Sequence, residues 1–320
     1  MPNNIKQIFL IGYYGYSNFG DEWLRQNSIK LLYKHFPNAK ITQLNAEKKS
    51  EYIHKYSLFK IIKQLYKSDM LVFGGGSLLQ SRSSLRSLLY YLGLIICAKT
   101  MGCSIYLLAQ GIGPLKSWQL GLCRKVLKNT IISYRDQNSA QLLELPGICV
   151  TDLAFYQAKI SPKKEAQKIG LVIQNDRRFS YRYLNWITTL SAANNLCLIV
   201  THQRDYKFAQ KIIKKTKLLP ILFLKDPIQT EPLNLLISSR YHAVIWACLQ
   251  RIPSLVINSD PKLESLIKQF NLASISFNCT GQDLKKAISS QQFSDQSFTD
   301  HVKQHIQYAN QFESQDFFIN

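Results

Sequence analysis

Arg240 and His242 are the residues whose types and spacing best suit anion binding and proton transfer. They stand two positions apart at the predicted start of a helix, directly after the apolar run Leu235–Ile237. A guanidinium beside the unpaired N–H groups of a helix N-terminus suits a phosphate or a carboxylate. A histidine in the same turn can take or donate a proton near neutral pH. The structural alternative is an arginine paired with a carboxylate and a histidine that fills a polar gap.

A glycine-rich loop near the N-terminus, Gly12–Glu22, is the second candidate. It follows the apolar run Ile8–Ile11 and precedes a predicted helix, a pattern typical of strand, loop and helix. Glycines let a ligand approach the main chain closely. The acidic pair Asp21 and Glu22 falls in the first helical turn, where a carboxylate stabilises the helix and can act as a base. The loop fits neither the dinucleotide fingerprint nor the P-loop, so it predicts a ligand-lining loop without naming the ligand.

Two further glycine loops, Gly74–Ser77 and Gln110–Pro114, follow apolar runs in the same way. Three such loops at successive strand ends predict a shared ligand groove, although glycine also serves tight turns alone. Arg135-Asp136 and Asp152 end two more strands, and a salt-bridged strand end explains Arg135 equally well. The residues expected to line the groove are Gly15, Asn18, Gly20, Gly75, Gly76, Ser77, Gln110, Gly111, Arg135 and Asp152.

The other histidines carry weaker signals. His202 follows a predicted strand, where it either lines the groove or caps the next helix. His301 and His305 have the spacing of a metal pair, but no H-E-x-x-H motif or third ligand accompanies them, so no metal is expected. The absence of a G-x-S-x-G elbow disfavours an α/β-hydrolase.

Short apolar runs alternate with helical patterns along the whole chain, which predicts an α/β fold with parallel sheets. The strands are expected at 6–11, 40–44, 69–73, 104–109, 130–134, 148–151, 168–174, 196–201, 220–224, 236–238, 253–258 and 273–277. The helices are expected at 22–35, 84–100, 116–128, 137–144, 181–193, 205–217, 241–250 and 261–270.

The lysine-rich stretch Ala158–Lys164 divides the chain into two halves of similar pattern. The prediction is two Rossmann-like domains, at 1–160 and 165–293, facing each other across a cleft. A polar tail at 294–320 is expected to be helical and to pack on the first domain. Ligands in such sheets collect at the carboxyl ends of the strands, which is where the glycine loops lie.

The charge of the chain predicts an anionic partner. The 320 residues include 40 Lys and Arg against 20 Asp and Glu, a formal charge of +20. Phosphorylated substrates and an anionic membrane surface both fit this excess, and a merely solvated basic surface is the plain alternative. Nucleic acid is not expected, because no nucleic-acid motif accompanies the charge.

The cysteines and the apolar segments bear on location. Seven scattered cysteines without a C-x-x-C pair indicate free thiols in a reducing compartment. The N-terminus leads directly into a strand, without a secretory leader. Leu85–Ala98 is too short to span a bilayer. A cytoplasmic protein with peripheral contact at the inner face of the membrane is the expectation.

Taken together and in order, these motifs resemble the polysaccharide pyruvyl transferase family, most closely its CsaB-type members, from Gly12 to about Leu272. The resemblance rests on the three glycine loops with Gly20-Asp21-Glu22, and on Arg135-Asp136 with Ser139. It continues through Thr151-Asp152 with Ala154-Phe155, Arg240-Tyr241-His242 and Asp260-Pro261-Lys262.

The resemblance implies a GT-B-like, metal-independent transferase. Members move the enolpyruvyl unit of phosphoenolpyruvate onto a sugar of a cell-surface polysaccharide precursor and form a pyruvate ketal. Arg240 and His242 match the family's donor-binding arginine and histidine, and Lys262 is a further expected donor contact. His242 is the first candidate for proton transfer or phosphate stabilisation, with Asp21 or Glu22 as the base. The first domain is expected to take the acceptor, which is a sugar or lipid-linked saccharide.

Gln174 departs from the pattern, because the family usually has a donor-binding arginine where the strand 168–174 ends. Arg177 or Arg178, just after the turn, are the expected replacements. A GT-B glycosyltransferase using a nucleotide sugar, and an inactive binding relative, therefore remain the alternatives.

Overall fold

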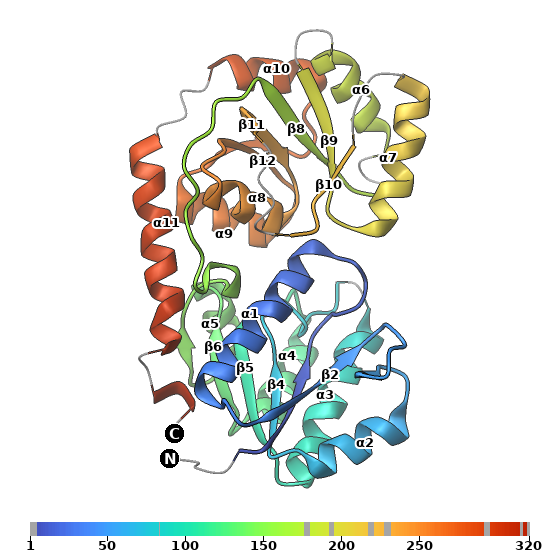
Figure 1. The fold of residues 1–320 in the computed structure, drawn as a ribbon, viewed down its shortest axis with the longest axis vertical. Helices are drawn as coiled ribbons and strands as arrows, with labels where there is room; N and C mark the ends of the chain where they lie inside the picture. The colour runs from blue at the N-terminus through green and yellow to red at the C-terminus, as the bar shows by residue number, and fades with distance from the viewer. Residues whose placement is uncertain are drawn as a thin grey trace. The chain divides into compact units, whose positions relative to one another are not determined.

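Buried apolar strands organise the chain into two parallel β-sheets (Figure 1). The computed structural model describes residues 5–82, 84–175, 180–191, 195–216, 221–226, 232–290, 295–313 and 316–318. Each sheet is the centre of one compact unit. The first unit comprises residues 1–16, 21–157 and 305–320, and the second comprises 17–20 and 158–304.

The first unit contains a seven-stranded sheet in the order β3-β2-β1-β4-β5-β6-β7. All described pairings in it are parallel, and the central strands β1 and β4 are buried on both faces, which explains why these two are continuous apolar runs. The strands are β1 (Gln7–Ile11), β2 (Lys40–Asn45), β3 (Tyr52–His54), β4 (Met70–Phe73), β5 (Ser104–Gln110), β6 (Ile131–Tyr134) and β7 (Ile148–Cys149).

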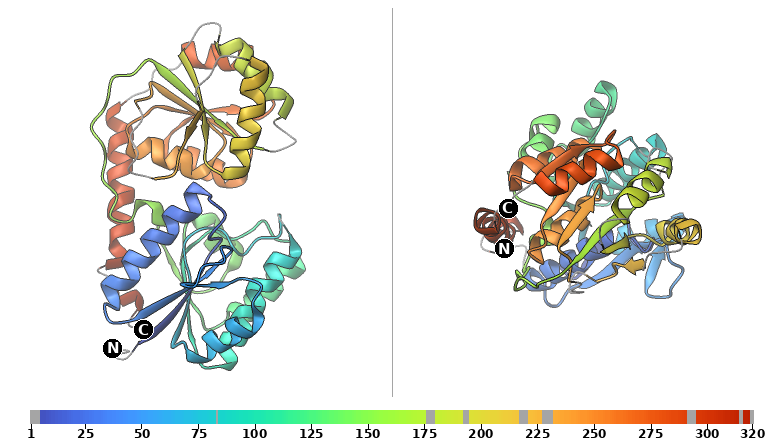
Figure 2. Two further views of the ribbon diagram at one scale, coloured as in Figure 1. Left: turned by 45° about the vertical axis from the view of Figure 1, so that its right-hand side comes forward. Right: turned by 90° about the horizontal axis from the view of Figure 1, so that it is seen from above.

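Helices cover this sheet on both faces (Figure 2). They are α1 (Phe19–His35), α2 (Leu58–Lys67), α3 (Leu85–Thr100), α4 (Ser117–Leu127) and α5 (Gln137–Leu143), followed by the short η1 (Leu153–Phe155). One core cluster joins buried residues of α2 to α5 with the strands, and Ile61 and Ile95 belong to it together with Phe73. On the other face, Tyr106 packs against the ring of Phe318 with centroids 5.3 Å apart. Helices α2 to α5 therefore share one face of the sheet.

The C-terminal segment from His305 onward belongs to the first unit. The Phe312 carbonyl oxygen lies 3.1 Å from His35 Nε2, and Thr151 Oγ1 lies 2.7 Å from His305 Nδ1. The tail thus ties together α1 and the loop after β7 by specific polar contacts.

The second unit contains a six-stranded parallel sheet in the order β10-β9-β8-β11-β12-β13. Its strands are β8 (Lys168–Ile173), β9 (Asn195–Val200), β10 (Ile221–Phe223), β11 (Leu235–Ser238), β12 (Ser254–Asn258) and β13 (Ala273–Ser276). Its helices are α6 (Ser180–Ser191), α7 (Gln203–Thr216), α8 (Tyr241–Leu249), α9 (Pro261–Phe270) and α10 (Gly281–Ser290), and α11 (Asp295–Asn310) continues into the first unit's residues. Trp186 and Trp246 are both fully buried within this unit.

The observed elements extend the sequence prediction at three places. Each expected strand range overlaps an observed strand, but β3, α2 and α10 were not expected. The first α-helix also begins earlier than expected, at Phe19, and Asp21 and Glu22 do lie in its first turn.

Candidate functional site

The strand order of each sheet reverses direction at one point, and the glycine and arginine motifs lie at those points. In the first unit the reversal falls between β1 and β4, which lead into Gly12–Gly15 and Gly74–Ser77. In the second it falls between β8 and β11, which lead into Gln174 and Arg240. Open α/β sheets bind ligands at such switch points, at the carboxyl ends of the strands. The strand order by itself therefore points to the first two glycine loops and to Arg240 as ligand-binding positions.

Arg240 occupies the N-cap of α8 and is held by a buried carboxylate. Its Nη2 lies 2.6 Å from Oδ2 of Asp205, a residue without solvent exposure in the first turn of α7. The Arg240 main-chain N–H donates to Ser238 Oγ at 2.9 Å. Its Nε is buried and has no hydrogen-bond partner within the described residues. The side chain remains 26% exposed, so the guanidinium is fixed on one edge while part of it stays accessible.

The end of β8 is tied to the same carboxylate. The Asn175 N–H donates to Asp205 Oδ1 at 2.8 Å. The Gln174 N–H donates to Tyr183 Oη at 3.0 Å, and burial raises the pKa of this tyrosine, which keeps it protonated. Asp205 thus joins the ends of β8 and β11. Gln174 itself is buried, and Arg177 and Arg178, the expected replacements for the family's arginine, lie outside the described residues.

The segment Ser17–Gly20 belongs by its contacts to the second unit. The Phe19 N–H donates to Thr201 O at 2.8 Å, and Asn18 forms an isolated antiparallel bridge with His202. A Cβ at Gly20 would overlap the imidazole ring of His242, so the absence of a side chain at this position leaves room for the ring. Gly20, predicted on the acceptor side, therefore neighbours His242, a predicted donor-binding residue, whereas Asn18 neighbours His202.

His202 serves as a cap of α7. Its Nδ1 accepts the Arg204 N–H at 3.1 Å, which is the capping alternative considered for it. Burial lowers the pKa of His202, and the positive charges of Arg204 and Arg240 add to this effect. The ring is thereby kept neutral beside the cationic Arg240.

In the first unit, Tyr14 fills the space beside two glycines. A Cβ at Gly12 would overlap the Tyr14 ring, and a Cβ at Gly74 would overlap its hydroxyl oxygen. Tyr14 is buried, and burial raises its pKa. Packing against Tyr14 therefore accounts for both glycines.

Glu22 holds the first glycine loop in shape. Its Oε1 accepts the Gly15 N–H at 2.8 Å, and its Oε2 pairs with Arg25 Nε at 2.7 Å. Gly15 has a φ of +80°, a conformation that favours glycine. Of the two acidic residues, Glu22 thus has a defined structural task, and Asp21 stands beside it in the same helical turn.

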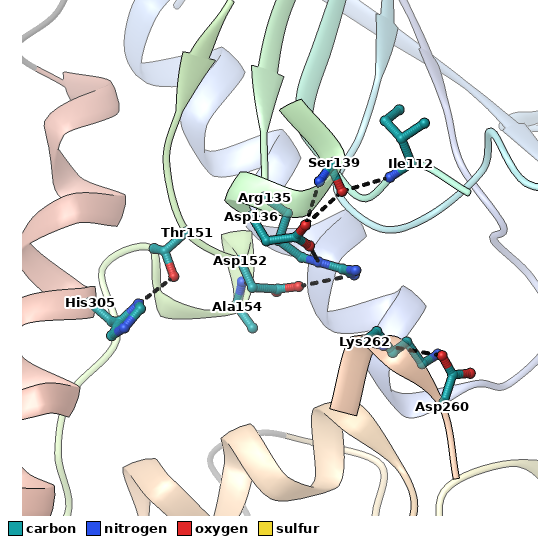
Figure 3. A network of polar contacts seen from close by, with 10 residues as sticks. All are labelled: Ile112, Arg135, Asp136, Ser139, Thr151, Asp152, Ala154, Asp260, Lys262 and His305. Atoms are coloured by element: carbon teal, nitrogen blue, oxygen red, sulfur yellow. Dashed lines mark hydrogen bonds and ion pairs between the residues drawn. The ribbon is translucent and has the colours of Figure 1, made fainter. Parts of the chain in front are cut away.

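Arg135 lies in a buried ion-pair network (Figure 3). Its Nε is 3.2 Å from Asp136 Oδ2, and its Nη1 is 3.8 Å from Asp152 Oδ2. Asp136 also caps α5 by accepting the Ser139 N–H at 2.8 Å. A Cβ at Gly111 would overlap the Arg135 guanidinium. This is the salt-bridged strand end considered as the alternative for Arg135, and it fixes the loop of Gly111.

The remaining predicted residues divide by exposure. Gln110 is fully buried and its Nε2 donates to the main-chain carbonyls of Gly74 and Leu108. The buried members shape the loops, so direct ligand contact is expected from the exposed ones. Gly75 and Gly76 are buried too, whereas Gly15, Asn18 and Ser77 are partly exposed, and Lys262 is exposed in the first turn of α9.

Residues 18–226 match the family described as polysaccharide pyruvyl transferase. The chain belongs to the polysaccharide pyruvyl transferase family. Members of this family are transferases of polysaccharide biosynthesis, and the present chain is therefore an enzyme. Its assignment to the CsaB-type members stays a prediction. A search of curated proteins found no match.

Solved structures show the same fold class. Anabaena Alr3699/HepE, in complex with UDP and glucose, has a TM-score of 0.61 at 10% identity, covering 98% of this chain and 100% of its own. MurG of Acinetobacter baumannii has a TM-score of 0.54 at 12% identity, with 97% of each chain covered. The S. aureus MnaA–UDP structure has a TM-score of 0.62 at 12% identity, covering 99% and 97%. The predicted GT-B-like class is confirmed, and at this identity the likeness concerns the fold alone.

Asp205 was not among the site residues predicted from the sequence. An aspartate in a first helical turn usually serves only the helix, and its partner Arg240 is 35 residues away. The available signal was its position shortly after the end of β9, at the same sheet edge as Arg240. The arrangement can hold an anion at Arg240 while Asp205 keeps the guanidinium oriented.

Proposed function

We propose that the protein transfers the enolpyruvyl unit of phosphoenolpyruvate onto a sugar of a cell-surface polysaccharide precursor, forming a pyruvate ketal and releasing phosphate. The family membership supports transfer in polysaccharide biosynthesis. The identity of the donor and the ketal chemistry are our inference from the site. Neither a metal nor an organic cofactor is required by this chemistry.

The position of Arg240 is the observation that carries the proposal. Its guanidinium stands at the N-cap of α8, at the switch point between β8 and β11. Phosphoenolpyruvate presents a phosphate and a carboxylate, and a guanidinium with a helix N-terminus suits either group. Asp205 holds one edge of Arg240, so the part of the guanidinium that stays exposed can meet the donor in a fixed orientation. Lys262, in the first turn of α9, adds a further cation.

His242 is our candidate for the proton that starts the reaction. A proton added to the methylene carbon of the donor makes a methyl group and leaves C2 electron-poor. A sugar hydroxyl attacks C2, the C2–O bond to phosphate breaks with its electron pair going to phosphate, and a second hydroxyl closes the ketal. Of the two hydroxyl protons, one replaces the proton given to carbon and the other leaves with phosphate. His242 in the first turn of α8 is suited to such transfers.

On the acceptor side Asp21 and Glu22, in the first turn of α1, are our two candidates for the base. Both carboxylate oxygens of Glu22 are engaged, with the Gly15 N–H and with Arg25. A base must accept a proton from the sugar hydroxyl, so Glu22 would have to give up one of these contacts to act as the base. The acceptor is proposed to be lipid-linked, at the inner face of the cytoplasmic membrane.

Ligand-induced stabilisation tests the donor. A ligand that binds only the folded state at about 100 times its Kd adds about 2.7 kcal/mol of stability. Phosphoenolpyruvate should raise the melting temperature, and UDP-glucose should not. Arg240→Lys should lose this effect, because lysine keeps the charge toward Asp205 but not the bidentate fork. Arg182→Lys, on the partly exposed α6 arginine that donates to Asn278, is the matched control and should keep it. Stabilisation by UDP-glucose but not by phosphoenolpyruvate would favour the nucleotide-sugar alternative.

A further inference from the structure

Helix α2 has an outward-facing apolar stripe in addition to the residues that pack into the core. Ile61 and Leu65 are buried, yet Phe59 and Tyr66 are each 80% exposed. At about 3.6 residues per turn, the outward residues fall within an arc of about 100°. This stripe consists of Leu58, Phe59, Ile62 and Tyr66.

The two neighbouring helices also carry exposed apolar residues. Helix α3 contacts both α2 and α4, and the three lie on one face of the sheet (Figures 1 and 2). Leu85, Leu89 and Ile96 are exposed along α3, and Trp118 at the start of α4 is 55% exposed. Exposed apolar residues scattered singly need no explanation, but a contiguous group marks an interaction site. We call these residues of the three helices the α2–α4 surface.

The region that carries the α2–α4 surface is almost free of acidic residues. Between residues 52 and 135 the chain has twelve Lys and Arg but only one acid, Asp69. The Asp69 carboxylate accepts the N–H groups of Lys6 and Gln7, at the amino end of the sheet. The apolar stripe is therefore flanked by positive charge on all three helices. The exposed cations of the region include Lys60, Lys63, Lys67, Arg82, Arg86 and Lys116.

An aromatic cluster connects this surface to the first glycine loop. Tyr13 and Tyr16 stack with centroids 4.0 Å apart, and Lys55 Nζ lies 4.4 Å from the Tyr16 ring centre and 4.7 Å from that of Tyr56. Tyr56 is exposed and stands two residues before α2. Because the helices run back from the carboxyl ends of parallel strands, their N-termini lie at the sheet edge that carries the glycine loops.

We propose that the α2–α4 surface docks on an anionic phospholipid bilayer. Apolar and aromatic side chains flanked by lysines are the pattern of helices that lie in the membrane interface, and each cation near an anionic lipid surface strengthens the attraction. Among the described helices none is long and apolar enough to cross a bilayer. A second protein copy would not need the uniform positive rim, which repels a like-charged partner. Docking would bring the first glycine loop to a lipid-linked acceptor, and this consequence rests on the proposed function. The docking itself does not.

Vesicle binding tests the surface without any substrate. The chain has four tryptophans, and Trp23, Trp186 and Trp246 are buried. Trp118 therefore reports insertion: its emission should shift to the blue with vesicles of phosphatidylcholine and phosphatidylglycerol, and Trp118→Phe should remove the shift. Phosphatidylcholine alone should bind more weakly. Binding that is lost completely at high salt, without a Trp118 shift, would overturn apolar docking.

Paired variants separate the docking surface from other exposed residues. Phe59→Ser with Tyr66→Ser should weaken partitioning on the order of tenfold, which corresponds to about 1.4 kcal/mol. Tyr33→Ser, on the exposed tyrosine of α1, should not change it. Lys60→Gln with Lys63→Gln should weaken binding to the anionic vesicles, whereas Lys285→Gln with Lys286→Gln on α10 should not.

Two outcomes contradict the proposal. One is equal partitioning of the α2 variants and their controls. The other is a dimer by light scattering that the α2 variants convert to a monomer, which would make the surface an interface between copies. Phosphoenolpyruvate-induced stabilisation should be unchanged in the α2 variants, so failure of docking and failure of the proposed function are distinguishable.

Discussion

Breaking the Asp205–Arg240 pair should destabilise the second unit, and the cost should depend on which partner is removed. Asp205 has no solvent exposure, whereas the Arg240 side chain is 26% exposed. Arg240→Ala leaves a buried carboxylate whose remaining hydrogen-bond donor, among the residues that the structure describes, is the Asn175 N–H at 2.8 Å. Asp205→Ala leaves a guanidinium that can still reach water. The arginine variant should therefore be the less stable of the two.

The magnitudes follow from this asymmetry. Removing one partner of a buried ion pair costs about 3–5 kcal/mol, and we expect Arg240→Ala in this range. For Asp205→Ala we expect about 2–3 kcal/mol, because the hydrogen bonds from Arg240 and from the Asn175 N–H are lost but the arginine can still reach water. The double variant should cost less than the sum, with a coupling of about 2 kcal/mol. For a unit of this size, 1 kcal/mol shifts the melting temperature by about 2–4 °C.

Urea unfolding of the four proteins measures these energies. Trp186 and Trp246 are both buried in the second unit, so the loss of their fluorescence signal follows its unfolding. Asp205→Asn, which keeps an acceptor for Asn175, should be intermediate. A coupling below about 0.5 kcal/mol, or an Asp205 variant less stable than the Arg240 variant, would refute the reasoning.

Three further predictions concern packing, pH and thiol access. Gly74→Ala should cost about 1–3 kcal/mol, because the new Cβ overlaps the Tyr14 hydroxyl, and Tyr14→Phe should restore part of it in urea unfolding; an unrelieved double variant contradicts this. The pKa of His202 is lowered below its ordinary 6.5, so the contribution of the neutral ring to the free energy of unfolding is fully present above pH 6.5 and is lost as the pH falls. His202→Gln should therefore make the free energy of unfolding less dependent on pH below 6.5, and an unchanged dependence would contradict this prediction. Cys149 is exposed, so a thiol reagent should label it before the buried Cys123 and Cys248. Peptide mapping of the labelled protein measures this order, and earlier labelling of Cys123 or Cys248 would contradict it.

The two sheets could be predicted from sequence because parallel strands covered on both faces are continuous apolar runs. Their alternation with helices then predicted parallel pairing, whereas the order of the strands in each sheet was not predicted. Helix α2 was not predicted. Six of its ten residues are apolar, so the hydrophobic periodicity does not separate the core residues from the outward stripe. The outward residues become visible only when exposure is known.

The candidate site was predictable in part for a similar reason. Arg240 and His242 stand close together in sequence, and so do Arg135 and Asp136. Contacts between residues far apart in the sequence could not be predicted: no local sequence pattern indicates that Asp205 pairs with Arg240 or that Tyr14 packs against Gly74. The local sequence around Arg240 gives no reason to expect that Arg240→Ala is destabilising; that expectation comes from the buried Asp205 carboxylate.

The most direct test of the proposed function follows the carbon of the donor. The protein is incubated with carbon-13 phosphoenolpyruvate and lipid-linked saccharides, and the saccharides are released and analysed by mass spectrometry. We predict a labelled saccharide that has gained one pyruvic acid less one water, with one phosphate released per ketal, and no product with Arg240→Lys. An unlabelled acceptor that instead gains a hexose from a UDP-sugar would contradict the account.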